Sequence, residues 1–343
     1  AYARITKKLG GLILEDNLVK ELIVHDQRVT EVITEHGKIK ADIVVNAAGL
    51  WSRQIGKMAG VEIPAGVVEH HYVVTDKCQE IATSLPTFRD PDGGYYIKPE
   101  LGALAIGGWH NKTKAVYPNE GLPWDCSRHL FETGFDHIEQ VITPAAKRIP
   151  ILNNLGIRNV INGPIPISPD GEPIMGLVPG LENFFTACAF TSGIAASGGA
   201  GKAMAQWILN GDPGMDLWHC DVRRFGEVHN GRHFLYDRAI ESYKQYYSIS
   251  YPEQEVLSAR GIKRSTLFDR LKNQGAMFGS KFGWERVNYF IKNDDGRIIP
   301  NTFNQTIRYS IIGQEHRAAR TKAVIIDQSS FTKFKINGEN SCE

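Results

Sequence analysis

The expected fold of this chain follows from one stretch near its beginning, Ala41-Asp42-Ile43-Val44-Val45-Asn46-Ala47-Ala48-Gly49-Leu50-Trp51-Ser52. Residues 42–46 form a short apolar run, which is typical of a parallel β-strand that is buried on both faces. Ala48 and Gly49 end this strand, and Ser52 can cap a helix over residues 53–59. The order of strand, turn and helix predicts one βα unit, the only clear one in the first part of the chain.

Small residues at this turn allow the backbone to come close to whatever lies above the carboxyl end of the strand. A bound cofactor is one such neighbour, and a generic strand-to-helix turn is the competing interpretation. No Gly-x-Gly-x-x-Gly sequence occurs in the chain, so the usual pyrophosphate fingerprint of a dinucleotide-binding fold is absent.

Hydrophobic periodicity and turn residues predict the other elements. We expect strands at residues 12–14, 19–24, 29–34, 67–75, 95–98, 104–106, 184–188, 323–327 and 334–336. We expect helices at residues 124–149, 194–210, 234–246 and 265–273. Gly37 suits a tight turn within residues 35–38, and Gly211 followed by Pro213 ends the helix at residue 210. The Pro- and Gly-rich residues 162–175 predict a loop with short strands.

Residues 189–202 are rich in glycine and alanine but do not form a phosphate loop. That motif needs Gly at position 196 and a hydroxyl at 203, and both positions are Ala. One interpretation is a helix whose small face packs tightly against a sheet. The other places the helix N-terminus, near residues 192–194, against an electron-rich group. The two interpretations are compatible.

Composition restricts the function classes. The 343 residues carry a formal net charge of +1, which gives no reason to expect a nucleic-acid partner. The apolar runs are too short to span a membrane. The cysteines are scattered and odd in number, which favours a reducing compartment, and they are Cys78, Cys126, Cys188, Cys220 and Cys342. Neither a metal-binding motif nor a serine-hydrolase elbow occurs, so the sequence predicts no metal site. Because the chain begins with Ala, we expect a truncated N-terminus.

Two pairs of aromatic residues are candidates for chemistry. Residues 68–74 alternate as a strand, so His70 and Tyr72 share one face and His71 lies on the other. One of the two histidines therefore faces the interior or a cleft, and a hydrogen-bonded core histidine is the commoner case. Tyr95 and Tyr96 also lie on opposite faces, and core packing is the default interpretation for both.

Taken together, these segments resemble the dimethylglycine/sarcosine dehydrogenase family, whose members are flavoproteins fused to a folate-binding aminomethyltransferase-like domain. The matching segments cover nearly the whole chain in order, and they are residues 44–51, 69–75, 94–100, 162–176, 211–213, 224–225, 241–243 and 283–290. Residues 315–331 resemble the beginning of the aminomethyltransferase-like domain.

The resemblance implies a mixed α/β and α+β architecture with an incomplete, glutathione-reductase-like FAD-binding domain of the DAO type. The expected parts are residues 1–66 and 161–214 for the FAD-binding domain and 67–160 for an antiparallel substrate domain. Residues 215–307 would form the central region. Residues 308–343 would begin the aminomethyltransferase-like domain.

The resemblance also implies a reaction. An N-methylated glycine, dimethylglycine or sarcosine, would lose a hydride from its methyl carbon to flavin N5 of FAD. The iminium would then be hydrolysed to formaldehyde or captured by tetrahydrofolate in the fused domain. His70 corresponds to the active-site histidine of the family, and either Tyr95 or Tyr96 corresponds to its tyrosine. The electron acceptor is not defined by the sequence.

The resemblance also implies which residues border the cofactor. Those implied to border the FAD are Ala48, Gly49 and Trp51. Those implied to border its flavin ring are Gly171, Glu172, Pro173, Thr191, Ser192, Gly193 and Ile194. Related sarcosine oxidases hold the substrate carboxylate with a Lys after the Gly-rich turn, where this chain has Ala195 and Ala196. Without the glycine fingerprint, we expect the chain alone not to bind FAD tightly.

Two other functions fit the same resemblance. One is a catalytically silent paralogue, like the regulatory subunit of pyruvate dehydrogenase phosphatase. The other is an aminomethyltransferase in which the flavin half is accessory. We expect the protein in the cytoplasm, with the mitochondrial matrix as the alternative.

Overall fold

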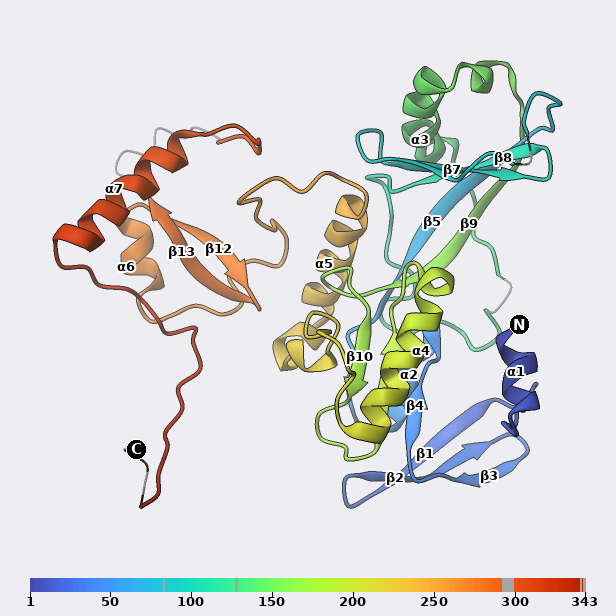
Figure 1. Cartoon of the computed structure of the whole chain (residues 1–343), viewed down its shortest axis with the longest axis horizontal. Coiled ribbons are helices and arrows are strands. Elements are labelled where there is room, and N and C mark those ends of the chain that lie inside the picture. Colours follow the sequence, from blue (N-terminus) through green and yellow to red (C-terminus); the bar gives the residue numbers. More distant parts are fainter. Residues whose placement is uncertain (83, 127–128, 292–298, 340, 342–343) are drawn as a thin grey trace.

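The computed structural model describes residues 1–82, 84–126, 129–291, 299–339 and 341, and Cys342 lies outside this part of the chain. Its strands form four sheets (Figure 1). The first is a meander of β1 (Val19–His25), β2 (Arg28–Thr34) and β3 (Gly37–Lys40). Gly37 enters β3 with φ +141°, which confirms the predicted turn. The strand predicted at residues 12–14 is wrong, because no described strand pairs with this exposed segment.

The predicted βα unit is confirmed. β4 (Val44–Asn46) lies parallel to β11 (Phe184–Cys188), and β10 (Ile174–Leu177) extends this sheet on the other side of β11. The turn η1 (Gly49–Trp51) leads into α2 (Ser52–Met58). The expected burial of β4 on both faces is wrong, because the side chain of Val45 is 40% exposed. Ser52 starts the helix without capping it.

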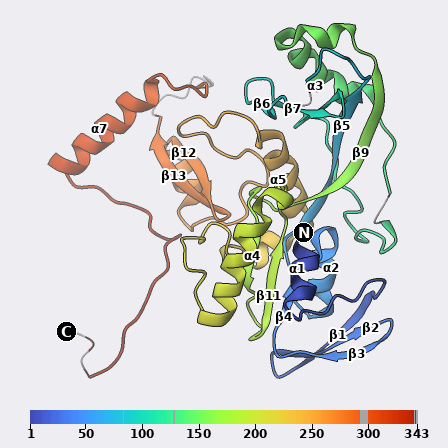
Figure 2. The same cartoon turned by 45° about the vertical axis from the view of Figure 1, so that its right-hand side comes forward.

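The largest sheet is antiparallel, in the order β6 (Phe88–Asp90), β7 (Tyr95–Glu100), β8 (Ala103–Gly108), β5 (Gly66–Thr75) and β9 (Ile157–Ile167). The long strands β5 and β9 run from this sheet toward the β4 sheet (Figure 2).

Helix α3 (Phe135–Arg148) packs on one face of the large sheet, and its inner residues join Val73, Ile97 and Ile106 in a common core. The helix predicted over residues 124–149 therefore begins later than expected. Before the helix, the backbone N–H of Phe131 donates a hydrogen bond to the carbonyl of Asn162 in β9, so this residue pairs with the sheet and not with a helix.

The helices α4 (Gly193–Asn210) and α5 (Arg232–Gln245) confirm two predictions. α4 packs against β10 and β11, and α5 packs against β5 and β9. α4 ends at Gly211 with φ +75°, as its sequence indicates. Shorter elements complete this part, namely α1 (Tyr2–Lys8), η3 (Pro150–Asn154), η4 (Val222–Arg224) and η5 (Glu227–Asn230). None of the described helices has the length and apolar character needed to cross a membrane.

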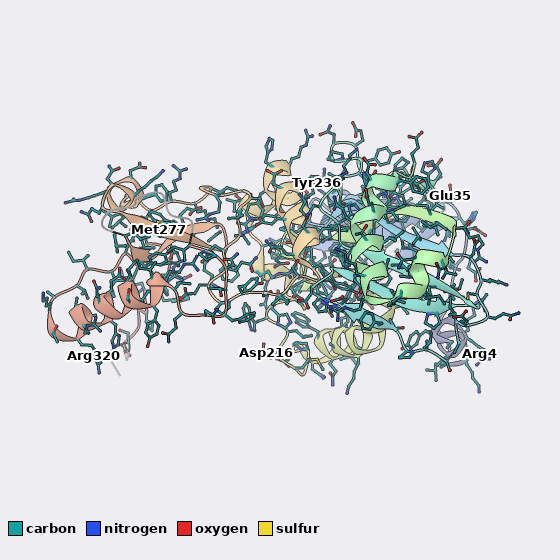
Figure 3. The ribbon with its side chains drawn as sticks, turned by 90° about the horizontal axis from the view of Figure 1, so that it is seen from above. Arg4, Glu35, Asp216, Tyr236, Met277 and Arg320 are labelled. Carbon is teal, nitrogen blue, oxygen red and sulfur yellow. The ribbon has the colours of Figure 1, made fainter. Side chains whose placement is uncertain are left out.

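A smaller unit forms the other end of the molecule. It contains α6 (Phe268–Asn273), the hairpin of β12 (Ala276–Lys281) and β13 (Trp284–Phe290), and α7 (Ile307–Thr321). Figure 3 shows it with Met277 and Arg320, opposite the end that holds Arg4 and Glu35. The strands predicted at residues 323–327 and 334–336 are wrong. No described strand pairs with them, and Ile325 is 97% exposed.

Candidate functional site

The face of the large sheet that lies opposite α3 carries a row of polar and aromatic side chains. Arg89 of β6 pairs with Tyr96 of β7, which pairs with Gly107 of β8, which pairs with Tyr72 of β5. Directly paired residues share a face, and His70 joins them because it lies two residues before Tyr72. We call this the substrate face, defined by Arg89, Tyr96, Gly107, Tyr72 and His70.

Gly107 is required for this arrangement. The phenol of Tyr96 lies over its α-carbon, and a β-carbon there would overlap the ring and hydroxyl of Tyr96. The absence of a side chain at Gly107 thus sets where the Tyr96 hydroxyl can reach.

His70 connects two phenols. Its Nδ1 lies 2.9 Å from the hydroxyl of Tyr243 in α5, and its Nε2 lies 3.3 Å from the hydroxyl of Tyr96. Burial, reinforced by the neighbouring His71, lowers the pKa of His70 to about 4, so its imidazole is neutral at pH 7. A neutral imidazole offers one donor and one acceptor, and the two phenols use both nitrogens.

The phenols remain protonated at neutral pH. Burial, together with the nearby Tyr247 and Tyr72, raises the pKa of Tyr96 to about 12. Burial likewise raises the pKa of Tyr243. The three side chains therefore form an uncharged hydrogen-bonded group at the centre of the substrate face.

Tyr95 lies on the opposite face. Its side chain is fully buried in the core under α3 together with Ile97 and Ile106. Its hydroxyl makes no well-formed hydrogen bond, although the Asp90 carboxylate is near, and burial together with this carboxylate raises its pKa to about 12. The structure thus brings Tyr96 to His70 and separates Tyr95 from it.

A cavity of about 580 Å³ lies next to the substrate face. Of the expected flavin-ring neighbours, it is lined by Gly171, Glu172, Pro173, Thr191 and Ser192. Arg89 lines it as well and therefore connects it to the substrate face. Tyr246 of α5 forms another wall, where its hydroxyl accepts a 2.6 Å hydrogen bond from Thr191 Oγ1.

The other expected cofactor neighbours lie outside this cavity. Gly193 and Ile194 begin α4, and the Ile194 side chain is 97% exposed. Ala48 packs on the core beneath α2. Gly49 has φ +55°, and the Trp51 indole donates a 3.0 Å hydrogen bond to the carbonyl of Pro123. These residues of the β4–α2 turn and those of the cavity form two separate groups.

Arg224 fixes the cavity turn. Its side chain is 5% exposed and binds the Asp170 carboxylate with two nitrogens, at 2.7 and 2.9 Å. It also donates to the carbonyl of Glu172 at 3.0 Å. Between these two anchors Gly171 adopts φ +79°, which favours glycine. A bidentate pair of this kind restricts orientation as well as distance.

These surroundings fit a flavin ring. The cavity combines a glycine turn with polar and aromatic walls, and α4 starts beside it at Gly193. The first amide N–H groups of a helix lack acceptors within the helix and favour negative charge on a neighbour.

Sequence reasoning missed several residues of the site, namely Arg89, Trp109, Tyr246, Tyr247 and the positioning residue Arg224. Arg224 and Tyr243 lie in segments that carry the family resemblance, at residues 224–225 and 241–243, which was the available signal. Tyr246 and Tyr247 lie just beyond the second of these segments, whereas Arg89 and Trp109 lie in none of the matching segments.

Three family models match this chain. FAD dependent oxidoreductase matches residues 1–207, FAD dependent oxidoreductase central domain matches 210–265, and GCVT N-terminal domain matches 267–343. The chain therefore belongs to the FAD dependent oxidoreductase family. The mixed α and β fold expected from the sequence is confirmed.

Individual relatives agree with the resemblance to dimethylglycine and sarcosine dehydrogenases. Mitochondrial dimethylglycine dehydrogenase of Homo sapiens is 34% identical, and the alignment covers 99% of this chain and 40% of the relative. Mitochondrial sarcosine dehydrogenase of Mus musculus is 32% identical, over 91% of this chain and 36% of the relative. The chain thus spans about two fifths of the length of these relatives. The mitochondrial regulatory subunit of pyruvate dehydrogenase phosphatase of Mus musculus is 31% identical, and the alignment covers 98% of this chain and 39% of the relative.

Solved structures show the same fold. L-proline dehydrogenase from P. horikoshii superimposes with a TM-score of 0.56 at 25% identity, over 65% of this chain and 57% of that chain. Glycine oxidase from Geobacillus kaustophilus superimposes with a TM-score of 0.51 at 21% identity, over 64% of this chain and 55% of that chain.

Proposed function

We propose that the protein containing this chain oxidises a small N-methylated amine with FAD, and that dimethylglycine and sarcosine are the first candidates. The observation that carries the proposal is the uncharged group of His70, Tyr96 and Tyr243, on a face that adjoins the cavity of the expected flavin neighbours. The relatives named dimethylglycine and sarcosine dehydrogenase support the substrate class.

When bound, FAD would supply the two-electron acceptor for the hydride that leaves the methyl carbon. The turn at residues 171–173 and the segment at residues 191–194 would hold its ring. The β4–α2 turn, with Ala48, Gly49 and Trp51, would border another part of the cofactor.

Aromatic side chains beside His70 suit a methylated amine. The rings of Trp109 and Tyr246 are 4.3 Å apart, and those of Trp109 and Tyr247 are 5.5 Å apart. The ring of His70 lies 4.9 Å from that of Trp109. Aromatic faces attract methylated ammonium groups and exclude water from the methyl carbons. This wall would favour an N-methylated nitrogen over a primary amine.

Arg89 is the candidate for the substrate carboxylate that the sequence left without a partner. Its guanidinium carbon lies 3.8 Å from the ring centroid of Tyr247, and the side chain lines the cavity. Among the ion pairs of the described residues, none involves Arg89. A guanidinium suits a carboxylate in a bidentate manner. Arg89 and the aromatic wall would thus bind the two ends of a methylated glycine.

His70 and Tyr96 would contact the amine, because they place polar atoms at the centre of the substrate face. Their role would be to orient the nitrogen by hydrogen bonds and so hold the methyl carbon in place. Tyr95, in the core under α3, has no part in this proposal.

The test uses the complete parent protein with its flavin, without oxygen. We expect dimethylglycine or sarcosine to bleach the flavin absorbance. A bound flavin that neither amine bleaches would refute both substrates. The next amine to test would then be 4-methylaminobutanoate, because an oxidase for it in Paenarthrobacter nicotinovorans is 31% identical.

A catalytically silent regulatory subunit is the second candidate, and the relative with that name supports it. A complete protein that purifies without flavin would favour this function. Tetrahydrofolate remains a proposed ligand of the domain whose beginning matches residues 267–343. The named mitochondrial relatives favour the mitochondrial matrix over the cytoplasm as the proposed compartment.

A further inference from the structure

Three histidines from separate elements meet on the α3 side of the large sheet. His71 belongs to β5, His110 follows β8, and His137 lies in the first turn of α3. Their ring centroids form a nearly equilateral triangle with sides of 4.6, 4.9 and 5.0 Å. One ring nitrogen of each lies within 4.8 Å of those of the other two. His71 and His110 are 2% and 3% exposed.

The hydrogen bonds of this cluster leave two of its buried ring nitrogens without a partner. His110 Nδ1 accepts from the Lys112 amide at 3.2 Å, so a neutral His110 carries its proton on Nε2. That atom lies 3.0 Å from His71 Nδ1 and donates to it, which puts the His71 proton on Nε2. His137 Nδ1 is buried without a partner, and an ion bound to it would satisfy this atom. His71 Nε2 is also buried without a partner and would keep its proton if Nδ1 binds the ion. A buried polar group without a partner destabilises the fold.

We propose that His71, His110 and His137 bind a divalent transition-metal ion, with Zn²⁺ as the first candidate. Three imidazoles are a common ligand set for zinc, and here they come from three separate elements of the fold. The ion would join α3 to β5 and to the end of β8. His71 and His70 point to opposite sides of the sheet, so the ion would lie across the sheet from His70. The two sites are neighbours, because the ring of His110 lies 5.7 Å from that of Tyr243.

The spacing of His71 and His110 is close to that of two ligands of one zinc ion. Zn–N bonds of about 2.1 Å in a tetrahedral site put neighbouring nitrogens roughly 3.4 Å apart. The 3.0 Å between His71 Nδ1 and His110 Nε2 is close to this spacing. Metal binding would replace that hydrogen bond, and ligation through Nε2 would move the His110 proton to Nδ1 and break the contact from Lys112.

The ion would have a route to the site. His110 lines an open cavity of about 540 Å³, together with Gly93, Asp136 and Gln140. The ammonium of Lys112 would repel a cation, but it lies 3.5 Å from the carboxylate of Asp136, which partly offsets its charge. A water molecule from this cavity can fill the fourth position that three protein ligands leave open.

The test is zinc binding to the complete parent protein, measured by elemental analysis after equilibration with Zn²⁺ and dialysis. We expect one Zn²⁺ per chain, and a rise in melting temperature that a chelator reverses. His137→Asn should weaken Zn²⁺ affinity at least tenfold. His233→Asn is the matched control, because His233 is an exposed histidine of α5 outside the cluster and should bind as the wild type does.

Two outcomes would overturn the proposal. One is less than one tenth of a Zn²⁺ per chain after equilibration, with no shift in melting temperature. The other is equal binding by the wild type and His137→Asn, which would assign the zinc to surface groups. Circular dichroism checks that His137→Asn is folded, and His71→Gln gives a second variant if it is not. These measurements need neither flavin nor substrate, so they stand apart from the proposed function.

Discussion

Two neighbouring tyrosines provide a sharp test of the proposed site. Tyr96→Phe removes a hydroxyl that lies 3.3 Å from His70 Nε2, whereas Tyr95→Phe removes one that makes no well-formed hydrogen bond. The two variants delete the same atom from adjacent residues of β7. They differ in the face of the sheet from which the atom is lost.

The expected magnitudes follow from these contacts. A hydrogen bond between neutral groups contributes about 1 kcal/mol, so Tyr96→Phe should slow flavin reduction at least about fivefold. A larger loss would mean that the hydroxyl also contacts the amine in the transition state. Tyr95→Phe loses no well-formed hydrogen bond and should leave the reduction rate unchanged. Its free energy of unfolding should be equal to that of the wild type or greater by up to ~1 kcal/mol.

The assay is stopped-flow reduction of the flavin in the complete protein without oxygen, together with thermal unfolding. Equal slowing by Tyr95→Phe and Tyr96→Phe would refute the assignment of the substrate face. A destabilised but catalytically normal Tyr96→Phe would refute it as well, because the hydroxyl would then serve packing alone.

Three further predictions concern charged residues. Arg89→Met should raise the KM for a carboxylated amine roughly 10- to 100-fold, because it removes a charge-assisted hydrogen bond of about 1.5–3 kcal/mol. The KM for an amine without a carboxylate should not change. Arg224→Lys should lower the free energy of unfolding by about 2 kcal/mol and weaken flavin retention, because it removes the bidentate pair with Asp170. The same change at Arg223, whose side chain is 68% exposed, should have little effect on unfolding or on flavin retention. Burial opposes ionisation of Glu285, but hydrogen bonds from Arg260 outweigh it and lower the pKa. The ionised Glu285 therefore stabilises the fold at pH values above its pKa in the unfolded chain, which is near 4.5. The free energy of unfolding should fall as the pH decreases below this value. Glu285→Gln should make the free energy of unfolding depend less on pH in this range.

Much of the local structure could be predicted because its causes lie within a few residues. The β4–α2 unit follows from an apolar run that ends in small residues, and the end of α4 follows from Gly211. Strand alternation placed His70 and His71 on opposite faces before any contact was known. The strands predicted at residues 323–327 and 334–336 failed, because a strand needs a neighbour to pair with and a β-rich sequence does not supply one.

The sequence by itself determined the family, the cofactor class and the candidate pair of His70 with a tyrosine, since these follow from short motifs and their order. Only the tertiary structure showed that Tyr96 lies beside His70 and Tyr95 in the core, because alternation separates two faces but does not say which one α3 covers. It also revealed Arg89 beside the cavity and the cluster of His71 with two distant histidines. Such groups form when strands and helices far apart in the chain pack together, and no local spacing records that contact.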